Sequence, residues 1–132
     1  MSLTFINPES LGAPRGYSNG VLTEGRRLLF IAGQIAWNEQ RQIVSADIVG
    51  QFDRALANVI AVITEAGGKP EQIARLVIYV TDKNEYRDRM KEIGERYRAR
   101  MGKHFPAMVL VEVAGLLEDS ARIEIEGVAV LD

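Results

Sequence analysis

Residues 48–80 read IVGQFDRALANVIAVITEAGGKPEQIARLVIYV, a helical pattern followed closely by a strand pattern. In the first part, apolar residues recur at spacings of three and four, which predicts an amphipathic helix over residues 47–66. Gly67, Gly68 and Pro70 are typical of a helix end. Ile73–Val80 is an almost continuous apolar run, which predicts a strand buried on both faces.

A second helix is expected over residues 83–101. Its apolar stripe is spaced like the first, and Asp82 with Glu85 forms a capping-box pattern at its start. Alternating or β-branched runs predict further strands. These strands cover residues 3–6, 21–23, 28–32, 109–113 and 122–130.

The order of these elements predicts an α+β domain over residues 1–132, with a mixed β-sheet and both helices on one face. No segment remains to cover the other face. We place Tyr79, Met108, Leu110 and Val111 on that face, where they would show apolar surface to water. The chain is therefore expected to form an oligomer with sheets facing one another around a closed ring.

Composition excludes several classes of protein. The chain has 132 residues, a net charge of −2 and no cysteine, so disulfides and thiolate metal sites are ruled out. No apolar run has the length of a membrane span and no secretory signal pattern opens the sequence, so no membrane partner and a cytoplasmic location are expected. The slightly acidic balance disfavours a nucleic-acid partner.

Few side chains offer catalytic chemistry. His104 is the only histidine and is expected to be structural, so no metal and no cofactor are predicted. Gly33 follows a strand, where a glycine permits close backbone approach and leaves amides free to meet a ligand oxygen. Glu124 has two interpretations: an ion pair with Arg122 on the same strand face, or a general base toward water beneath a neighbouring subunit.

Five segments, in the same order, together resemble one family. The chain is similar to the RidA family, also called YjgF and, in older labels, endoribonuclease L-PSP. The segments are GYSNGV at 16–21, AGQI at 32–35, QFDRALAN at 51–58 with AGG at 66–68, FPA at 105–107 and IEIEGVA at 123–129.

The resemblance implies a chorismate-mutase-like fold and a homotrimer whose sheets form an inner β-barrel. It also implies that small metabolites bind in clefts between adjacent subunits. The best-known members hydrolyse reactive enamines and imines, such as 2-aminoacrylate, to a keto acid and ammonia. In those members an arginine grips the substrate carboxylate, a glutamate on the last strand acts on water, and a tyrosine closes the site.

Carried onto this sequence, the resemblance matches Tyr17 and Glu124 to the tyrosine and the glutamate, the expected catalytic pair. Met108 stands at the arginine position, and Leu110 stands where many members have a cysteine. The ligand-binding set implied in this way, with Arg122 added as a nearby cation, is Ala32, Gly33, Gln34, Lys91, Met108, Leu110 and Arg122.

Three functions remain open at this point. The first is a divergent trimer that binds a small, more apolar metabolite and carries out a hydrolytic step with Glu124. The second is an ordinary imine deaminase in which Arg15, Lys91 or Arg122 replaces the arginine, whose loss would otherwise cost about 10- to 1000-fold. The third is a non-catalytic regulatory or chaperone-like trimer or, as the weakest version, the ribonuclease that the older family label suggests.

Overall fold

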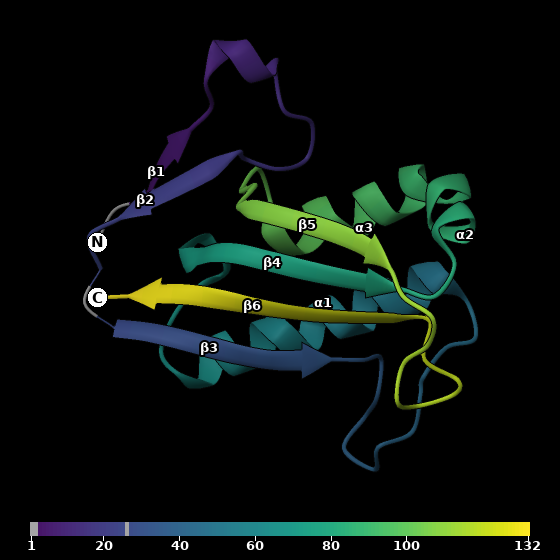
Figure 1. Ribbon diagram of the computed structural model, residues 1–132. Coiled ribbons are helices and arrows are strands. Elements are labelled where there is room, and N and C mark those ends of the chain that lie inside the picture. The colour runs from purple at the N-terminus through teal and green to yellow at the C-terminus, as the bar shows by residue number, and fades with distance from the viewer. Residues whose placement is uncertain (1–2, 26) are drawn as a thin grey trace.

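The computed structural model describes residues 3–25 and 27–132, and its body is a four-stranded sheet with helices on one side (Figure 1). The strand order is β3-β6-β4-β5; β4 and β5 are parallel and the other neighbours are antiparallel. The strands are β1 (Leu3–Ile6), β2 (Gly20–Thr23), β3 (Arg27–Gln34), β4 (Ile73–Val80), β5 (Ala107–Glu112) and β6 (Ile123–Leu131). The helices are α1 (Ile48–Glu65), α2 (Lys83–Asp88) and α3 (Met90–Met101), with short 3₁₀ turns at Glu9–Leu11 and Pro70–Gln72.

Helix α1 forms where the apolar pattern predicts it. The Asp47 carboxylate accepts a hydrogen bond from the Gly50 amide and caps the start. Gly67, with φ 86°, follows the end of the helix. The apolar stripe lies buried against β3 and β6 and comprises Ile48, Phe52, Leu56, Val59 and Ile63.

The second predicted helix is interrupted at Arg89, so the expectation of one continuous helix is wrong. Arg89 has φ −116° and ψ 19°, outside the helical region, and its guanidinium pairs with Asp47, at 2.7 Å, and with Glu92. Asp82 does cap α2, accepting from the amides of residues 84 and 85. Glu85 turns instead to Arg122 and forms no reciprocal cap among the described contacts.

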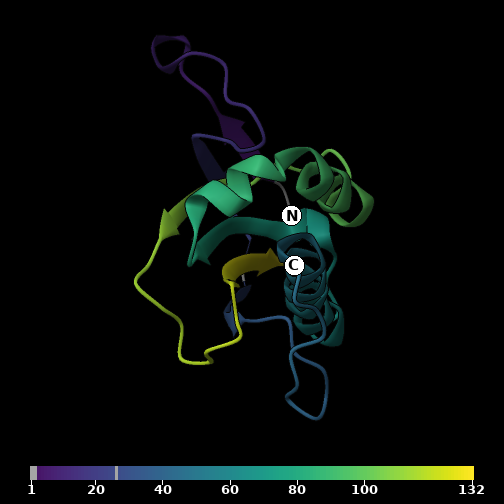
Figure 2. The same cartoon turned by 90° about the vertical axis from the view of Figure 1, so that its right-hand side faces the viewer.

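The two faces of the sheet differ as the alternation on β6 predicts. Ile123, Ile125 and Ala129 are buried beneath the helices, whereas Glu124 and Glu126 lie on the opposite, helix-free face that Figures 1 and 2 show. The fold class predicted from the sequence is therefore confirmed.

Placing Met108 and Leu110 on the helix-free face was wrong. They stand opposite Leu76 and Ile78, which belong to the core, and both pack against that core. The physical reason is the period of two along a strand: with Tyr79 opposite Val111, Met108 and Leu110 must point to the helices. The exposed apolar side chains of the other face are Leu28, Phe30, Val109 and Val111.

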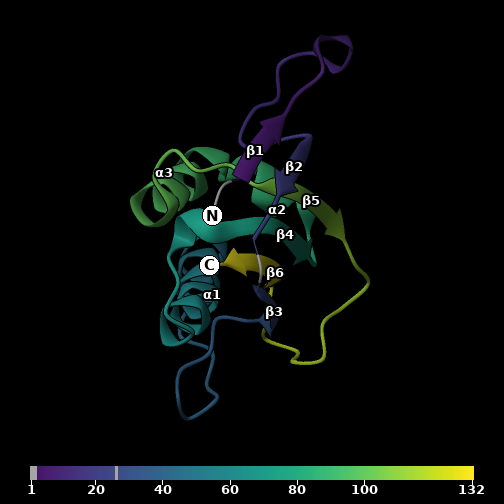
Figure 3. The ribbon, with the colours of Figure 1, turned by 90° about the vertical axis from the view of Figure 1, so that its left-hand side faces the viewer.

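Residues 3–25, which we call the arm, project from one end of the body (Figure 3). Within the arm, β1 pairs with β2 in a sheet of its own. The arm is fixed to the start of β5 by Ser18, which bridges to Ala107, and by an edge-on ring contact between Phe5 and His104 at 5.7 Å. None of the described helices is long and apolar enough to cross a membrane.

Candidate functional site

The first candidate site is a pocket of about 470 Å³ beside β5, between the pair α2–α3 and the part of the arm that carries Tyr17. Met108 and Leu110 line it from β5. The remaining walls are mostly aromatic and aliphatic and include Phe52, Ile78, Tyr86, Met90, Ile93, Tyr97 and Phe105. Such a pocket suits a small ligand with substantial apolar surface.

Three tyrosines, Tyr17, Tyr86 and Tyr97, contribute hydroxyl groups to the walls of this pocket. Tyr17 is 40% exposed at its mouth, so a bound ligand would contact it without displacing buried side chains. Burial raises the pKa of Tyr86 to about 12, and burial also raises the pKa of Tyr97. Both phenols therefore stay neutral near pH 7; the Tyr97 hydroxyl donates to the His104 carbonyl at 2.6 Å.

Two guanidinium groups border the same pocket. Arg15 enters from the arm and Arg98 from α3, and neither has a carboxylate within 4 Å among the described residues. Of the cations considered from the sequence, Arg15 is thus the one that the structure brings beside Met108. Arg98 was not among the candidate residues from the sequence, although its spacing of four from Gly94 places its guanidinium over that glycine.

Glu124 lies in a different hollow, of about 150 Å³, together with Gly33, Ile35 and Trp37. A Cβ at position 33 would lie only 1.9 Å from Glu124 Oε2, so the carboxylate occupies the space that a side chain would need. The close approach expected at Gly33 is therefore present. It fixes a carboxylate beside the backbone at the end of β3.

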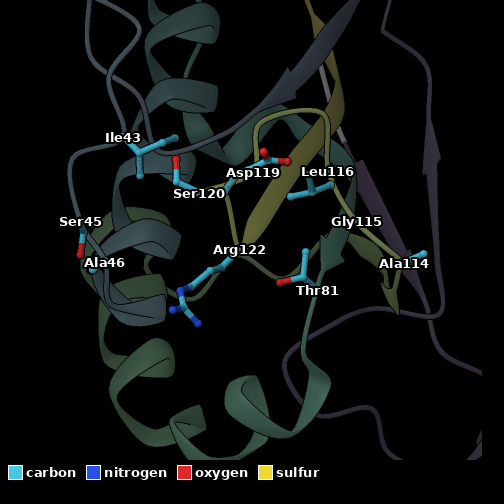
Figure 4. A pocket seen from close by; sticks show the side chains of 11 residues that line it. Ile43, Ser45, Ala46, Thr81, Ala114, Gly115, Leu116, Asp119, Ser120 and Arg122 are labelled. Carbon is cyan, nitrogen blue, oxygen red and sulfur yellow. The ribbon is translucent and has the colours of Figure 1, made fainter.

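Arg122 does not pair with Glu124. Its guanidinium donates to Glu85 Oε2 at 2.6 Å, so the ion pair with Arg122, one of the two interpretations of Glu124, does not form. Figure 4 shows Arg122 in a third hollow, of about 910 Å³, beside Thr81, Asp119 and Ser120. Because its charge is already paired there and it lines neither of the first two hollows, Arg122 is poorly placed as a substitute for the arginine.

The other residues of the predicted ligand-binding set lie outside both hollows. Lys91 is exposed on α3 and does not line the apolar pocket, whereas its neighbour Met90 does. Ala32 is exposed on β3, and the Gln34 side chain donates back to its carbonyl at 3.1 Å. The sequence signal for Met90 was its place on the apolar stripe of the helix.

No group of acidic, histidine or cysteine side chains that could hold a metal occurs among residues 3–25 and 27–132. His104 is buried, and its Nε2 lies 2.7 Å from the carbonyl oxygen of Ile73. That contact ties the end of α3 to the start of β4, in keeping with the structural role expected for this histidine.

The two hollows share no lining residue: Tyr17, Met108 and Leu110 belong to one, and Gly33 and Glu124 to the other. The first is lined mostly by apolar side chains, and the second contains a carboxylate. A single copy of the chain therefore holds two separate halves of the predicted site.

Comparison with known proteins identifies the family. Residues 8–131 match the model of the family described as endoribonuclease L-PSP. The chain is 33% identical over 133 residues, 98% of each protein, to the 2-iminobutanoate/2-iminopropanoate deaminase of Escherichia coli. The Rid-family protein YyfB from Yersinia pestis has 32% identity and a TM-score of 0.88, over 99% of this chain and 100% of the other. E. coli TdcF with bound serine has 30% identity and a TM-score of 0.69, over 92% of each chain.

These matches extend over almost the whole chain and include both the arm and the last strand. The protein is therefore a member of the RidA family.

Proposed function

We propose that this protein is a deaminase-type hydrolase for a small, largely apolar imine or enamine, bound between adjacent copies of a homotrimer. The observation that carries the proposal is the division of the site. Met108 and Leu110 make one half apolar, and Glu124 is held over Gly33 in the other half. The name of the E. coli deaminase and the serine bound to TdcF support a small-molecule ligand with nitrogen chemistry.

The reaction follows from these groups. Glu124 accepts a proton from water while the water oxygen forms a bond to the imine carbon, and the proton passes to the nitrogen. The resulting carbinolamine then gives up its hydroxyl proton, which Glu124 passes to the nitrogen, and cleavage of the carbon–nitrogen bond leaves a carbonyl compound and ammonia. Tyr17 stands at the mouth of the pocket, where it orients the ligand and limits access of other water molecules.

Methionine at position 108 decides which substrates are accepted. It provides no donor for a carboxylate, whereas an arginine gives charge-assisted, two-pronged hydrogen bonds. An imine without a carboxylate therefore fits this pocket better than an imino acid.

A second candidate, an ordinary imino-acid deaminase, is favoured by one specific observation. Arg15 and Arg98 line the pocket that contains Met108, and neither is paired with a described carboxylate. Either could grip an imino acid from a new direction. Arg15→Gln and Arg98→Gln would each reveal such a role as a loss confined to imines that carry a carboxylate.

The test compares two classes of imine generated in situ. An amino-acid oxidase supplies imines with a carboxylate, and a flavin amine oxidase supplies imines without one. We expect the native protein to accelerate loss of the second class over its spontaneous hydrolysis, and Glu124→Gln to abolish that acceleration. Met108→Arg should raise the rate with the first class by about 10- to 1000-fold.

Two results would contradict the proposal. Full acceleration by Glu124→Gln would remove the carboxylate from the mechanism. No acceleration of either class, in the native protein and in Met108→Arg alike, would favour the non-catalytic regulatory function instead.

A further inference from the structure

Several strands are paired along one edge only among the described residues, and two of them, β2 and β3, follow one another in the chain. β2 pairs only with β1, and β3 pairs only with β6. Apolar side chains accompany both open edges: Leu22 is 61%, Leu28 57% and Phe30 72% exposed. An open, apolar strand edge is a template for another strand, and proteins usually cover such an edge.

The chain cannot cover its own edge in this arrangement, although only residues 24–26 separate β2 from β3. Ser18, just before β2, is fixed at the far side of the sheet. Its hydroxyl donates to the Phe105 carbonyl at 2.5 Å and its amide to the Pro106 carbonyl at 3.0 Å. β5 and β3 are the two opposite edges of the sheet, so β2 is held away from β3.

We propose that the arm is exchanged between copies: β2 of one copy pairs antiparallel with β3 of a second copy. Each copy has one open β2 edge to give and one open β3 edge to receive. The contact is therefore head-to-tail, and repeating it around a rotation axis closes a ring in which each β2 edge and each β3 edge is covered.

The register of this pairing joins the two halves of the site. We take the register that β2 and β3 would have in a hairpin closed by residues 24–26. In that register Thr23 lies opposite Arg27 and Leu22 lies opposite Leu28. Continued along the strands, the same register places Tyr17 opposite Gly33. The pocket of the first copy, with its Tyr17, then meets the Glu124 that stands over Gly33 in the second copy.

The exchange deepens the proposed function by assigning Tyr17 to the copy that supplies Met108 and Glu124 to the next copy. The exchange rests on the ring assembly included in the proposed function, but its test does not measure enzyme activity. A failed exchange and a failed activity are therefore distinguishable.

The test uses disulfide trapping, because the native sequence contains no cysteine. Leu22→Cys and Leu28→Cys, carried on separate chains with different tags, are mixed, unfolded, refolded together and oxidised. We expect a non-reducing gel to show the band shift from 14.6 kDa to twice that mass, with both tags in the product. Leu22→Cys mixed with Ala61→Cys, an exposed position on α1, is the matched control and should give far less of this product.

The double variant Leu22→Cys/Leu28→Cys tests the alternative that β2 pairs with β3 of its own chain. If β2 folds back on its own β3, oxidation gives a disulfide within one chain, the band stays at the monomer mass, and the mixed single variants give no joint product. That result overturns the exchange. Absence of any disulfide above the control level, with the refolded proteins still assembled on size-exclusion chromatography, overturns it as well.

Discussion

Glycine at position 33 shows how one residue can determine the chemistry of a site. Gly33→Ala would place a Cβ 1.9 Å from Glu124 Oε2, so the carboxylate must move. We expect imine hydrolysis to fall by about 10- to 100-fold, as misplacement of a catalytic group by roughly 1 Å does. Far-ultraviolet circular dichroism should be unchanged. Gly115→Ala, where a Cβ meets nothing within 4 Å, is the control. Native turnover by Gly33→Ala would show that the position of Glu124 does not matter.

Gln51 is a second residue whose replacement has a definite expected effect. Its amide is fully buried, donates to the carbonyls of Ser45 and Ser120, and accepts from the Arg122 amide at 2.8 Å. Gln51→Leu leaves these backbone groups without partners, which costs about 1–3 kcal/mol each when they stay dry. We expect a loss of about 3 kcal/mol or more in the free energy of unfolding, measured by urea denaturation at fixed protein concentration. Gln42→Leu, at an exposed position, should change it little. A loss equal to that of Gln42→Leu would contradict the role assigned to Gln51.

At the scale of elements, the ion pair between Asp53 on α1 and Arg100 on α3 makes a pH-dependent contribution to the free energy of unfolding. The hydrogen bond from Arg100, at 2.8 Å, is the main cause that lowers the pKa of Asp53 below 3.8. A lowered folded-state pKa means that the pair stabilises the fold above the unfolded-state pKa and loses its contribution as pH falls below it. Asp53→Asn should therefore cost about 0.5–1 kcal/mol at pH 7 and progressively less toward pH 3. Urea denaturation of the native protein and of Asp53→Asn between pH 7 and pH 3 measures this cost. A cost that grows as the pH falls would contradict the stabilising role assigned to the ion pair.

The elements also show what the sequence could and could not predict. β1 and β4 begin and end where their apolar runs do, and α1 follows its stripe closely, because local pattern and tertiary burial agree there. The break at Arg89 was not predictable from the stripe, since the apolar spacing continues across it and the ion pair of Arg89 with Asp47 joins positions 42 residues apart. Met108 and Leu110 were placed on the wrong face because successive residues of a strand alternate between faces, and only the pairing of Tyr79 with Val111 shows which set points to the helices.

For the whole molecule, the exposed apolar face and the proposed division of the site both lead us to expect more than one copy. Phe30, 72% exposed, and Val109, 43% exposed, lie on the face that no helix covers (Figure 1). We expect a mass near three times 14.6 kDa in solution by light scattering at micromolar concentration. Phe30→Lys would put a charge into the covered face and should shift the protein toward smaller species. A stable native monomer would contradict the shared site.

The most direct test of the shared site is activity complementation. Met108→Trp fills the apolar pocket and Glu124→Gln removes the carboxylate, so each variant alone should be inactive in imine hydrolysis. If the two halves come from different copies, refolding an equal mixture regenerates intact sites at some interfaces, and about a quarter of the native activity should return. If both halves of each site come from one chain, no intact site can form, the mixture stays as inactive as its components, and the account is contradicted.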